Sequence, residues 1–295
     1  MAWVADANLA AAVSEAGGLG IIAAMNMSGE LLREEIKKLR AVTDKPFGVN
    51  VMLMSPFAAE VAEVVVEERV PVVTTGAGNP VTYMKKWLDA GVKVIPVVAS
   101  VALAQMVERR GATAVVAEGG ESGGHIGEAN TMPLVPQVAD AVDIPGIAAG
   151  GIADGRGLAA AIMLGAEGVQ MGTRFLVAKE CTVHENYKRK VLKAGDIGTM
   201  VSGRRAGHPV RALKTPFARA YAELEKDLSV TDEQIAAFGA GALKKAVVDG
   251  DEEGGSFLCG SVAGLVTKEQ TCKEIIEDVV SGAEKLLSSA SRRLV

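Results

Sequence analysis

Cysteine is scarce in this sequence, and long apolar runs are missing from it. The three cysteines, Cys181, Cys259 and Cys272, are odd in number and lack the spacing of a metal site, so we expect no bound metal. They fit a reducing compartment better than a disulfide framework, which predicts a cytoplasmic protein. No apolar run reaches the ~18–20 residues of a membrane span, and the start lacks the basic segment of a signal peptide. We therefore expect no membrane partner.

A strong excess of charge of either sign is also missing. The chain has 31 Lys and Arg against 36 Asp and Glu, a net charge of −5, which does not suggest a nucleic-acid partner. Aromatic residues make up only 4% of the 295 residues, so the core is expected to consist of small aliphatic side chains. Neither GxGxxG at the start of a βαβ unit nor GxxxxGK[ST] occurs, so a Rossmann or P-loop nucleotide site is not expected.

Seven short apolar runs rich in β-branched residues alternate with longer amphipathic stretches. The runs lie at 20–25, 47–52, 70–76, 93–98, 114–119, 145–151 and 168–173. They are apolar almost throughout, which predicts strands of a parallel sheet that is buried on both faces. Their spacing of roughly 22–30 residues is the rhythm of a TIM-type (β/α)8 barrel. A doubly wound sheet would give a similar pattern through the first half.

Seven strands are one fewer than a closed barrel needs. The chain opens directly into an Ala-rich helix that Asp6 or Asn8 could cap, with no strand before it. We therefore expect a barrel that lacks its first strand in this chain, open between the strands at 20–25 and 168–173. We also expect the natural chain to begin about 15–20 residues upstream of Met1, which is enough for one more strand and its turn.

The strand–helix rhythm stops after residue 173. The following segment holds the polar helix "HENYKRKVLKAGD", the basic stretch "SGRRAGHPVRALK" and the acidic helix "FARAYAELEKDL". We expect residues 180–258 to form a small substrate or lid domain inserted after the last strand. Residues 1–179 and 259–295 would form the barrel, with the C-terminal helix returning to it.

Glycine clusters follow several of the predicted strands. The segment "EGGESGGHIGE", residues 118–128, combines five glycines with His125, one of only three histidines. Because chemistry gathers at the carboxyl ends of barrel strands, this loop is a candidate active site. The clusters at Gly150, Gly151, Gly172 and Thr173 follow the last two strands, where barrels commonly bind phosphate. Tight turns without a ligand would give the same clusters.

A set of motifs makes a family resemblance specific. The motifs are "MAWVAD", "GGLGII", "DKPFGVN", "VVTTGAGNP", "AEGGESGGHIG", "IPGIAAGGIADG", "LGAEGVQMGTRF" and "GHPVRALK". Together they resemble the FMN-dependent enoyl-acyl carrier protein reductase II family, which lies within the wider group of nitronate monooxygenases. The resemblance runs from Met1 to about residue 264. It implies an FMN-binding barrel with a small lid, usually dimeric, that reduces enoyl thioesters on acyl carrier protein with NADH or NADPH. A response to monovalent cations is implied as well.

The resemblance also assigns residues to roles. It places the active-site histidine at His125 and implies flavin contacts at Met1, Ala2, Asn50, Thr75, Glu118, Gly123, Gly124, Gly150, Gly151, Gln170, Gly172 and Thr173. Enoyl reduction needs a hydride at the β-carbon, a proton at the α-carbon and polarisation of the thioester carbonyl, and an imidazole can supply the last two. A purely structural role for His125 is the alternative.

The basic stretch suggests a docking site for an acidic carrier protein or a nucleotide phosphate. Its candidate residues are Arg204, Arg205, His208 and Arg211, and a solvated basic face is an equally open interpretation. His184 begins a charged helix and is expected to be solvated. Two further functions stay open: a nitronate monooxygenase that uses FMN and oxygen, and a flavin-binding protein without catalysis.

Overall fold

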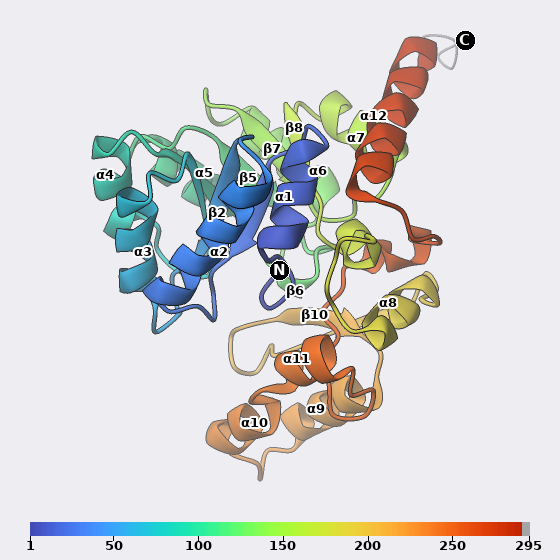
Figure 1. The fold of residues 1–295 in the computed structure, drawn as a ribbon. Coiled ribbons are helices and arrows are strands. Elements are labelled where there is room, and N and C mark those ends of the chain that lie inside the picture. The colour runs from blue at the N-terminus through green and yellow to red at the C-terminus, as the bar shows by residue number, and fades with distance from the viewer. Residues whose placement is uncertain (291–295) are drawn as a thin grey trace.

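The computed structural model describes residues 1–290 and contains an open, curled barrel of seven parallel strands (Figure 1). The order along this sheet is β1-β2-β3-β4-β5-β7-β8, so each strand lies next to its neighbour in the chain. The strands are β1 (Gly20–Ala23), β2 (Phe47–Met52), β3 (Val72–Gly76), β4 (Lys93–Val98), β5 (Val115–Glu118), β7 (Gly146–Ala149) and β8 (Gly168–Gln170). The predicted TIM-type barrel is confirmed, and each strand falls inside its predicted run or matches it.

Because side chains alternate between the two faces of each strand, the apolar residues form one cluster inside the curled sheet and another outside it. Val73, Val94 and Val115 point outward and pack with the helices in the larger apolar cluster. Their neighbours Val72 and Val116 point inward and form a small cluster inside the curled sheet. Both faces of the sheet are therefore apolar at mid-strand, which explains why the runs read as continuously hydrophobic.

The sheet is open between β1 and β8, as the strand count predicts. Among the described residues, β1 pairs only with β2, and β8 pairs only with β7. The segment before β1 folds back along it, because the amide of Ala23 donates to the carbonyl of Ala5 at 2.9 Å. Asp6 caps the helix α1 (Ala7–Glu15) by accepting from the amide of Leu9.

Helices connect the strands and cover the outer face of the sheet. They are α2 (Gly29–Val42), α3 (Ala58–Glu67), α4 (Val81–Asp89), α5 (Val101–Glu108), α6 (Thr131–Ala139) and α7 (Gly155–Met163). Ser28 caps α2, Ser100 caps α5 and Asp154 caps α7 through side-chain acceptors. The outer helices α3 and α4 lie on the surface away from β6 in Figure 1.

A second, three-stranded sheet follows the barrel, and its strand order is β6-β10-β9. Strands β9 (Thr199–Ser202) and β10 (Val210–Leu213) form an antiparallel hairpin, and β6 (Gly124–His125) joins its outer edge. The glycine-rich loop thus contributes one strand to this sheet. The helices α9 (Pro216–Lys226), α10 (Asp232–Gly239) and α11 (Ala242–Lys244) lie beyond it, at the bottom of Figure 1.

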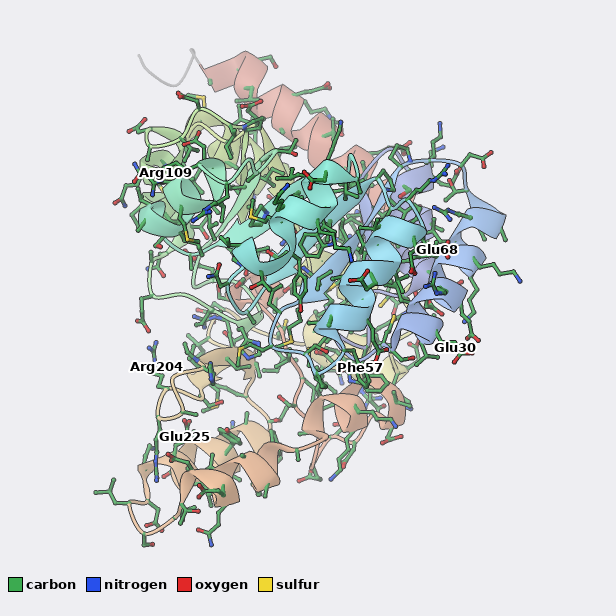
Figure 2. All side chains as sticks on the ribbon, turned by 90° about the vertical axis from the view of Figure 1, so that its left-hand side faces the viewer. Glu30, Phe57, Glu68, Arg109, Arg204 and Glu225 are labelled. Atoms are coloured by element: carbon green, nitrogen blue, oxygen red, sulfur yellow. The ribbon has the colours of Figure 1, made fainter. Side chains whose placement is uncertain are left out.

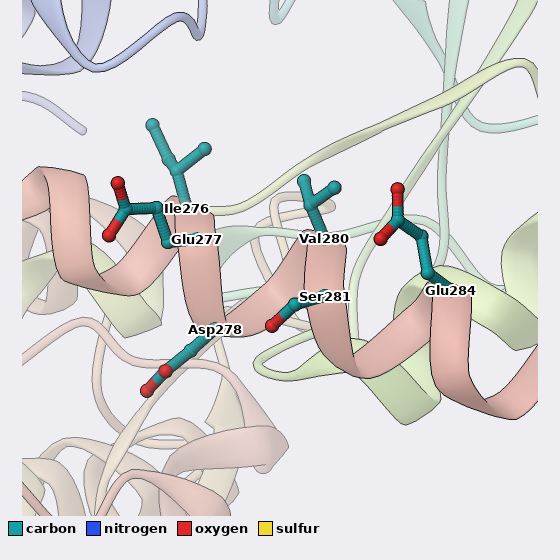
Figure 3. A pocket seen from close by; sticks show the side chains of 6 residues that line it. All are labelled: Ile276, Glu277, Asp278, Val280, Ser281 and Glu284. Atoms are coloured by element: carbon teal, nitrogen blue, oxygen red, sulfur yellow. The ribbon is translucent and has the colours of Figure 1, made fainter.

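The remaining segments connect this sheet to the barrel. They are η1 (Thr173–Val177), α8 (Glu185–Leu192), the π-helical turn η2 (Lys245–Asp249), η3 (Ser261–Leu265) and α12 (Cys272–Ser289). The final helix α12 packs on α7 and also contacts α1. A shallow groove runs along α12 between Ile276 and Glu284 (Figure 3), away from the carboxyl ends of the strands. No helix in residues 1–290 is long and apolar enough to cross a bilayer.

Candidate active site

Polar side chains replace apolar ones where the inward-facing positions reach the carboxyl ends of the strands. Counting every second residue along each strand from the inward-facing cluster shows which side chains point inward here. They are Asn50 on β2, Thr74 on β3, Glu118 on β5 and Gln170 on β8. Asn50 donates from Nδ2 to the hydroxyl oxygen of Thr74 at 2.9 Å. A ligand at this end of the curled sheet would therefore meet a ring of hydrogen-bonding groups around an apolar floor.

Thr75 lies on the opposite face of β3 from Thr74. Its side chain lies on the same face of the strand as that of Val73, which packs in the outer cluster, and only 1% of its surface is exposed. A ligand inside the sheet would therefore contact the backbone of Thr75, while the hydroxyl of Thr74 faces the interior. The sequence analysis names Thr75 and does not name Thr74. Counting every second residue from the inward-facing Val72 identifies Thr74.

Glu118 brings an ionisable group into this ring. Burial disfavours its carboxylate and raises its pKa to about 7, while the positive charge of the amino terminus acts in the opposite direction. A carboxyl group with such a pKa exchanges its proton near neutral pH, so Glu118 can either accept or donate a hydrogen bond there.

The glycines after β7 and β8 form a backbone cradle. Gly150 and Gly151 have φ values of +94° and +75°, which favour glycine. A Cβ atom at Gly172 would meet only the side chain of Met1, with Sδ at 3.4 Å. Thr173 has a different use, because its hydroxyl oxygen accepts from the amide of Gly260 at 2.9 Å. A Cβ atom at Gly150 would come within 2.9 Å of the Gly119 carbonyl oxygen, so this glycine packs closely on the glycine-rich loop. The backbone near Gly172 leaves more room for a ligand, while the side chain of Thr173 is engaged.

Two buried polar atoms in residues 1–290 have no hydrogen-bond partner, the Nδ2 of Asn26 and the Oγ of Ser122. Asn26 follows the carboxyl end of β1, and Ser122 lies in the glycine-rich loop after β5. Orphaned donors are costly unless a ligand or water satisfies them. Together with the glycine cradle and the ring of polar side chains, they fit a ligand with many acceptors and a phosphate, as FMN has. Sequence reasoning missed both residues, although each lies at a strand end.

The glycine-rich loop owes several of its glycines to packing between backbones. A Cβ at Gly123 would come within 2.7 Å of the backbone of Cys259 and Gly260, and one at Gly119 within 2.2 Å of the Thr131 amide nitrogen. Gly124 needs a positive φ of +80° to enter β6. The loop is held further by Glu121, whose carboxylate accepts from the amide and hydroxyl of Thr131 at 2.8 and 2.9 Å. The glycines therefore let the loop lie against other parts of the chain.

His125 is exposed on β6 and lies at the junction of the two sheets. Its backbone pairs with Val210 on β10, and its ring lies 6.4 Å from the ring of His208, edge to face at 78°. Partial burial lowers the pKa of His125, and the nearby His208 lowers it further. An imidazole held in this way is accessible to a ligand and able to exchange a proton near neutral pH.

The residues of the predicted basic stretch differ in how strongly they are held by contacts within the chain. Arg205 contacts the backbone carbonyls of Asp227 and Val230, and it pairs with Asp232 at 3.0 Å. Arg211 reaches back to the glycine-rich loop. Arg204 is the exposed member, with 58% of its side chain accessible and a single ion pair to Glu128 at 2.9 Å (Figure 2). His208 is exposed as well.

The remaining predicted residues lie at the periphery of this region. Met1 is exposed and touches the Gly172 position, and Ala2 follows it as a half-buried residue. His184 is exposed as expected, and its Nδ1 accepts from the amide of Asn186 at 3.1 Å, capping α8.

Comparisons with known proteins agree with this geometry. The chain is similar to FabK from Thermotoga maritima, with 53% identity, a TM-score of 0.97 and coverage of 100% of this chain and 94% of that one. It is 38% identical to (3aS,4S,5R,7aS)-5-hydroxy-7a-methyl-1-oxo-octahydro-1H-indene-4-carboxyl-CoA dehydrogenase of Mycobacterium tuberculosis, over 99% of this chain and 93% of that protein. It is also 30% identical to a probable nitronate monooxygenase of Staphylococcus saprophyticus, covering 98% and 94%. The family model of nitronate monooxygenase matches residues 1–282, so the chain belongs to the nitronate monooxygenase family of oxidoreductases.

Proposed function

We propose that this protein reduces the 2,3 double bond of enoyl thioesters carried by acyl carrier protein, with FMN as its cofactor. The observation that carries the proposal is the similarity to FabK, which extends over the whole chain at 53% identity. The sequence motifs, which resemble enoyl-acyl carrier protein reductase II, agree with it. The Mycobacterium tuberculosis relative is named for a coenzyme A thioester substrate, which fits the same substrate class.

The residues at the carboxyl ends of the strands suit FMN. Gly150, Gly151 and Gly172 would offer backbone amides to the phosphate. Asn26, Asn50 and Gln170 would donate hydrogen bonds to the flavin ring or its side chain. We also propose flavin contacts at the remaining positions that the family resemblance implies. Bound FMN supplies a hydride to the β-carbon of the enoyl thioester.

His125 would complete the reaction at the α-carbon. Its imidazole is exposed on β6, which follows β5 through the glycine-rich loop, and is accessible to a substrate. In the protonated form it can donate a proton to the α-carbon or a hydrogen bond to the thioester carbonyl as negative charge develops there.

We further propose that residues 180–258 act as a lid and that Arg204 contributes to carrier-protein docking. Of the four candidate docking residues, Arg205 and Arg211 are engaged within the chain, so the exposed Arg204 and His208 are the ones a partner can reach. We include NADH or NADPH as the reductant, a monovalent cation and a homodimer, which the resemblance implies. We also include a cytoplasmic location, which the cysteine content favours.

A second candidate function is nitronate oxidation with FMN and oxygen. It is favoured by the family model and by the probable nitronate monooxygenase that is 30% identical. In that reaction His125 would act as a base, so it needs the neutral imidazole. The two functions therefore make opposite demands on the protonation state of the same residue.

The deciding experiment uses the purified protein. Its visible spectrum tests for bound flavin. Oxidation of NADH and NADPH is then followed with and without crotonyl thioester, in parallel with oxygen uptake in the presence of a nitronate. Thioester-dependent oxidation of the nucleotide supports the reductase, and nitronate-dependent oxygen uptake supports the monooxygenase. A colourless protein without either activity would contradict both.

A further inference from the structure

The structure brings a second imidazole to the candidate active site. His208 lies in the turn between β9 and β10, and His125 lies on the strand that pairs with β10. Their ring centroids are 6.4 Å apart at an interplanar angle of 78°. These are two of only three histidines in the chain.

Backbone hydrogen bonds fix this approach. The amide of His208 donates to the carbonyl of Gly203 at 3.0 Å, which closes the turn. The amide of Ile126 donates to the carbonyl of Pro209 at 3.0 Å, next to the Val210–His125 pair. The two histidines therefore stand on adjacent, cross-linked backbone segments, which hold their backbones close together.

The other charged groups around this pair are held by contacts within the chain. Arg204, in the same turn, pairs with Glu128 at 2.9 Å. Arg211 on β10 donates to the carbonyl of Gly120, and Glu121 on the glycine-rich loop accepts from Thr131. The His208 ring lies at short range from the His125 ring, and two unit charges on these rings would repel each other.

We infer that His208 is a positioning residue that sets the protonation state of His125: when the His208 ring is protonated, its charge disfavours a proton on His125. Partial burial of His125 acts in the same direction, so the two effects add. The effect of His208 on turnover rests on the proposed function. The mutual repulsion of the two protonated imidazoles does not depend on which reaction the protein catalyses.

The test is a histidine titration of the flavin-loaded protein, followed by NMR of the imidazole carbon-bound protons. With three histidines, the signals are assigned by His125→Gln, His184→Gln and His208→Gln. We expect His208→Gln to move the His125 midpoint upward in pH, because the neighbouring charge is lost. His208→Lys, which keeps a positive charge, should hold the midpoint at or below its original pH.

The control is His184→Gln, the same substitution at an exposed histidine that caps α8. It should leave the His125 midpoint unchanged. If His208→Gln leaves that midpoint in place, or if the Gln and Lys variants move it equally, the inference is wrong.

A kinetic arm connects the titration to turnover. If the proposed reduction is correct, the pH at which turnover falls on the alkaline side should move upward in His208→Gln and not in His184→Gln. A shifted titration without any thioester-dependent turnover in the parent protein would refute the proposed function and leave the histidine coupling intact. Turnover with an unshifted titration would refute the coupling alone.

Discussion

The guanidinium of Arg211 donates two hydrogen bonds to the carbonyl oxygen of Gly120, from Nε at 3.0 Å and from Nη2 at 2.8 Å. Its third nitrogen, Nη1, donates to the hydroxyl of Thr199 at 3.2 Å. Arg211 therefore ties the glycine-rich loop of the barrel to both strands of the β9–β10 hairpin. A residue that the sequence suggests for phosphate or carrier-protein docking is used inside the chain.

Arg211→Gln should loosen this connection. Loss of charged hydrogen bonds to a half-buried carbonyl is expected to cost about 1–3 kcal/mol of unfolding free energy, measured by urea denaturation. Hydrogen exchange of the amides in residues 119–126 should accelerate. Arg204→Gln is the control, because an exposed ion pair contributes only about 0–1 kcal/mol. Equal effects of the two variants would contradict the structural role of Arg211.

His125→Ala should retain flavin and lose turnover. We expect the rate of enoyl reduction to fall about 10²-fold or more, because a proton donor and a carbonyl contact are removed. Flavin content is read from the visible absorbance and turnover from NADH or NADPH oxidation, with His184→Ala as the control. Parent-like turnover in His125→Ala would make the histidine structural.

Gly172→Val tests the proposed phosphate cradle without imposing backbone strain. The φ of Gly172 is −111°, so valine is tolerated, and its Cβ would meet only the Met1 side chain. Crowding of the ligand should weaken FMN binding by about 10–100-fold, the equivalent of about 1–3 kcal/mol. Gly146→Val is the matched control, since nothing lies within 4 Å of a Cβ at that strand start. Full flavin content in Gly172→Val would place the phosphate elsewhere.

Glu118 should make the stability of the flavin-free protein depend on pH. Its folded pKa of about 7 lies above the ordinary value of 4.5, so the folded state holds the proton more tightly than the unfolded state. Stability from this group is present below pH 4.5 and is lost as the pH rises to 7, by at most about 3 kcal/mol. Glu118→Gln should lack this loss, as measured by urea denaturation at several pH values. Parallel curves for the two proteins would contradict the raised pKa.

Arg204→Glu should affect a carrier-protein substrate more than a short coenzyme A thioester. Reversing one exposed charge is expected to lower kcat/KM for the acyl carrier protein substrate about fivefold at low salt, roughly 1 kcal/mol, and less at high salt. Lys85→Glu, an exposed reversal on α4, is the control. An identical loss with both substrates at every salt concentration would argue against docking.

The barrel could be predicted because its signal is local. Buried parallel strands are apolar on both faces, and Asp154 marks a helix start by its own side chain. The open edge between β1 and β8 followed from counting strands. By contrast, β6 is only two residues long and pairs with a strand that begins 85 positions later, so no local pattern reveals it.

The strand ends that surround the candidate site could be predicted, whereas the contacts of single residues there could not. Glycine clusters identified the strand ends, but they did not separate ligand contact from backbone packing, as Gly123 against Cys259 illustrates. The inward position of Thr74 follows from parity within β3. The unsatisfied amide of Asn26 and hydroxyl of Ser122 could not be anticipated, because hydrogen-bond satisfaction depends on the folded surroundings.

The pairing of β6 with β10 also limits how this protein can be divided. Excision of residues 180–258 would remove β9 and β10 and leave Gly124 and His125 without their strand partner. A chimera that exchanges this stretch with a relative would meet a foreign glycine-rich loop at its edge. The exchangeable unit is therefore discontinuous: it comprises the hairpin and its helices together with residues 119–126, which end 73 positions before the hairpin begins at Thr199.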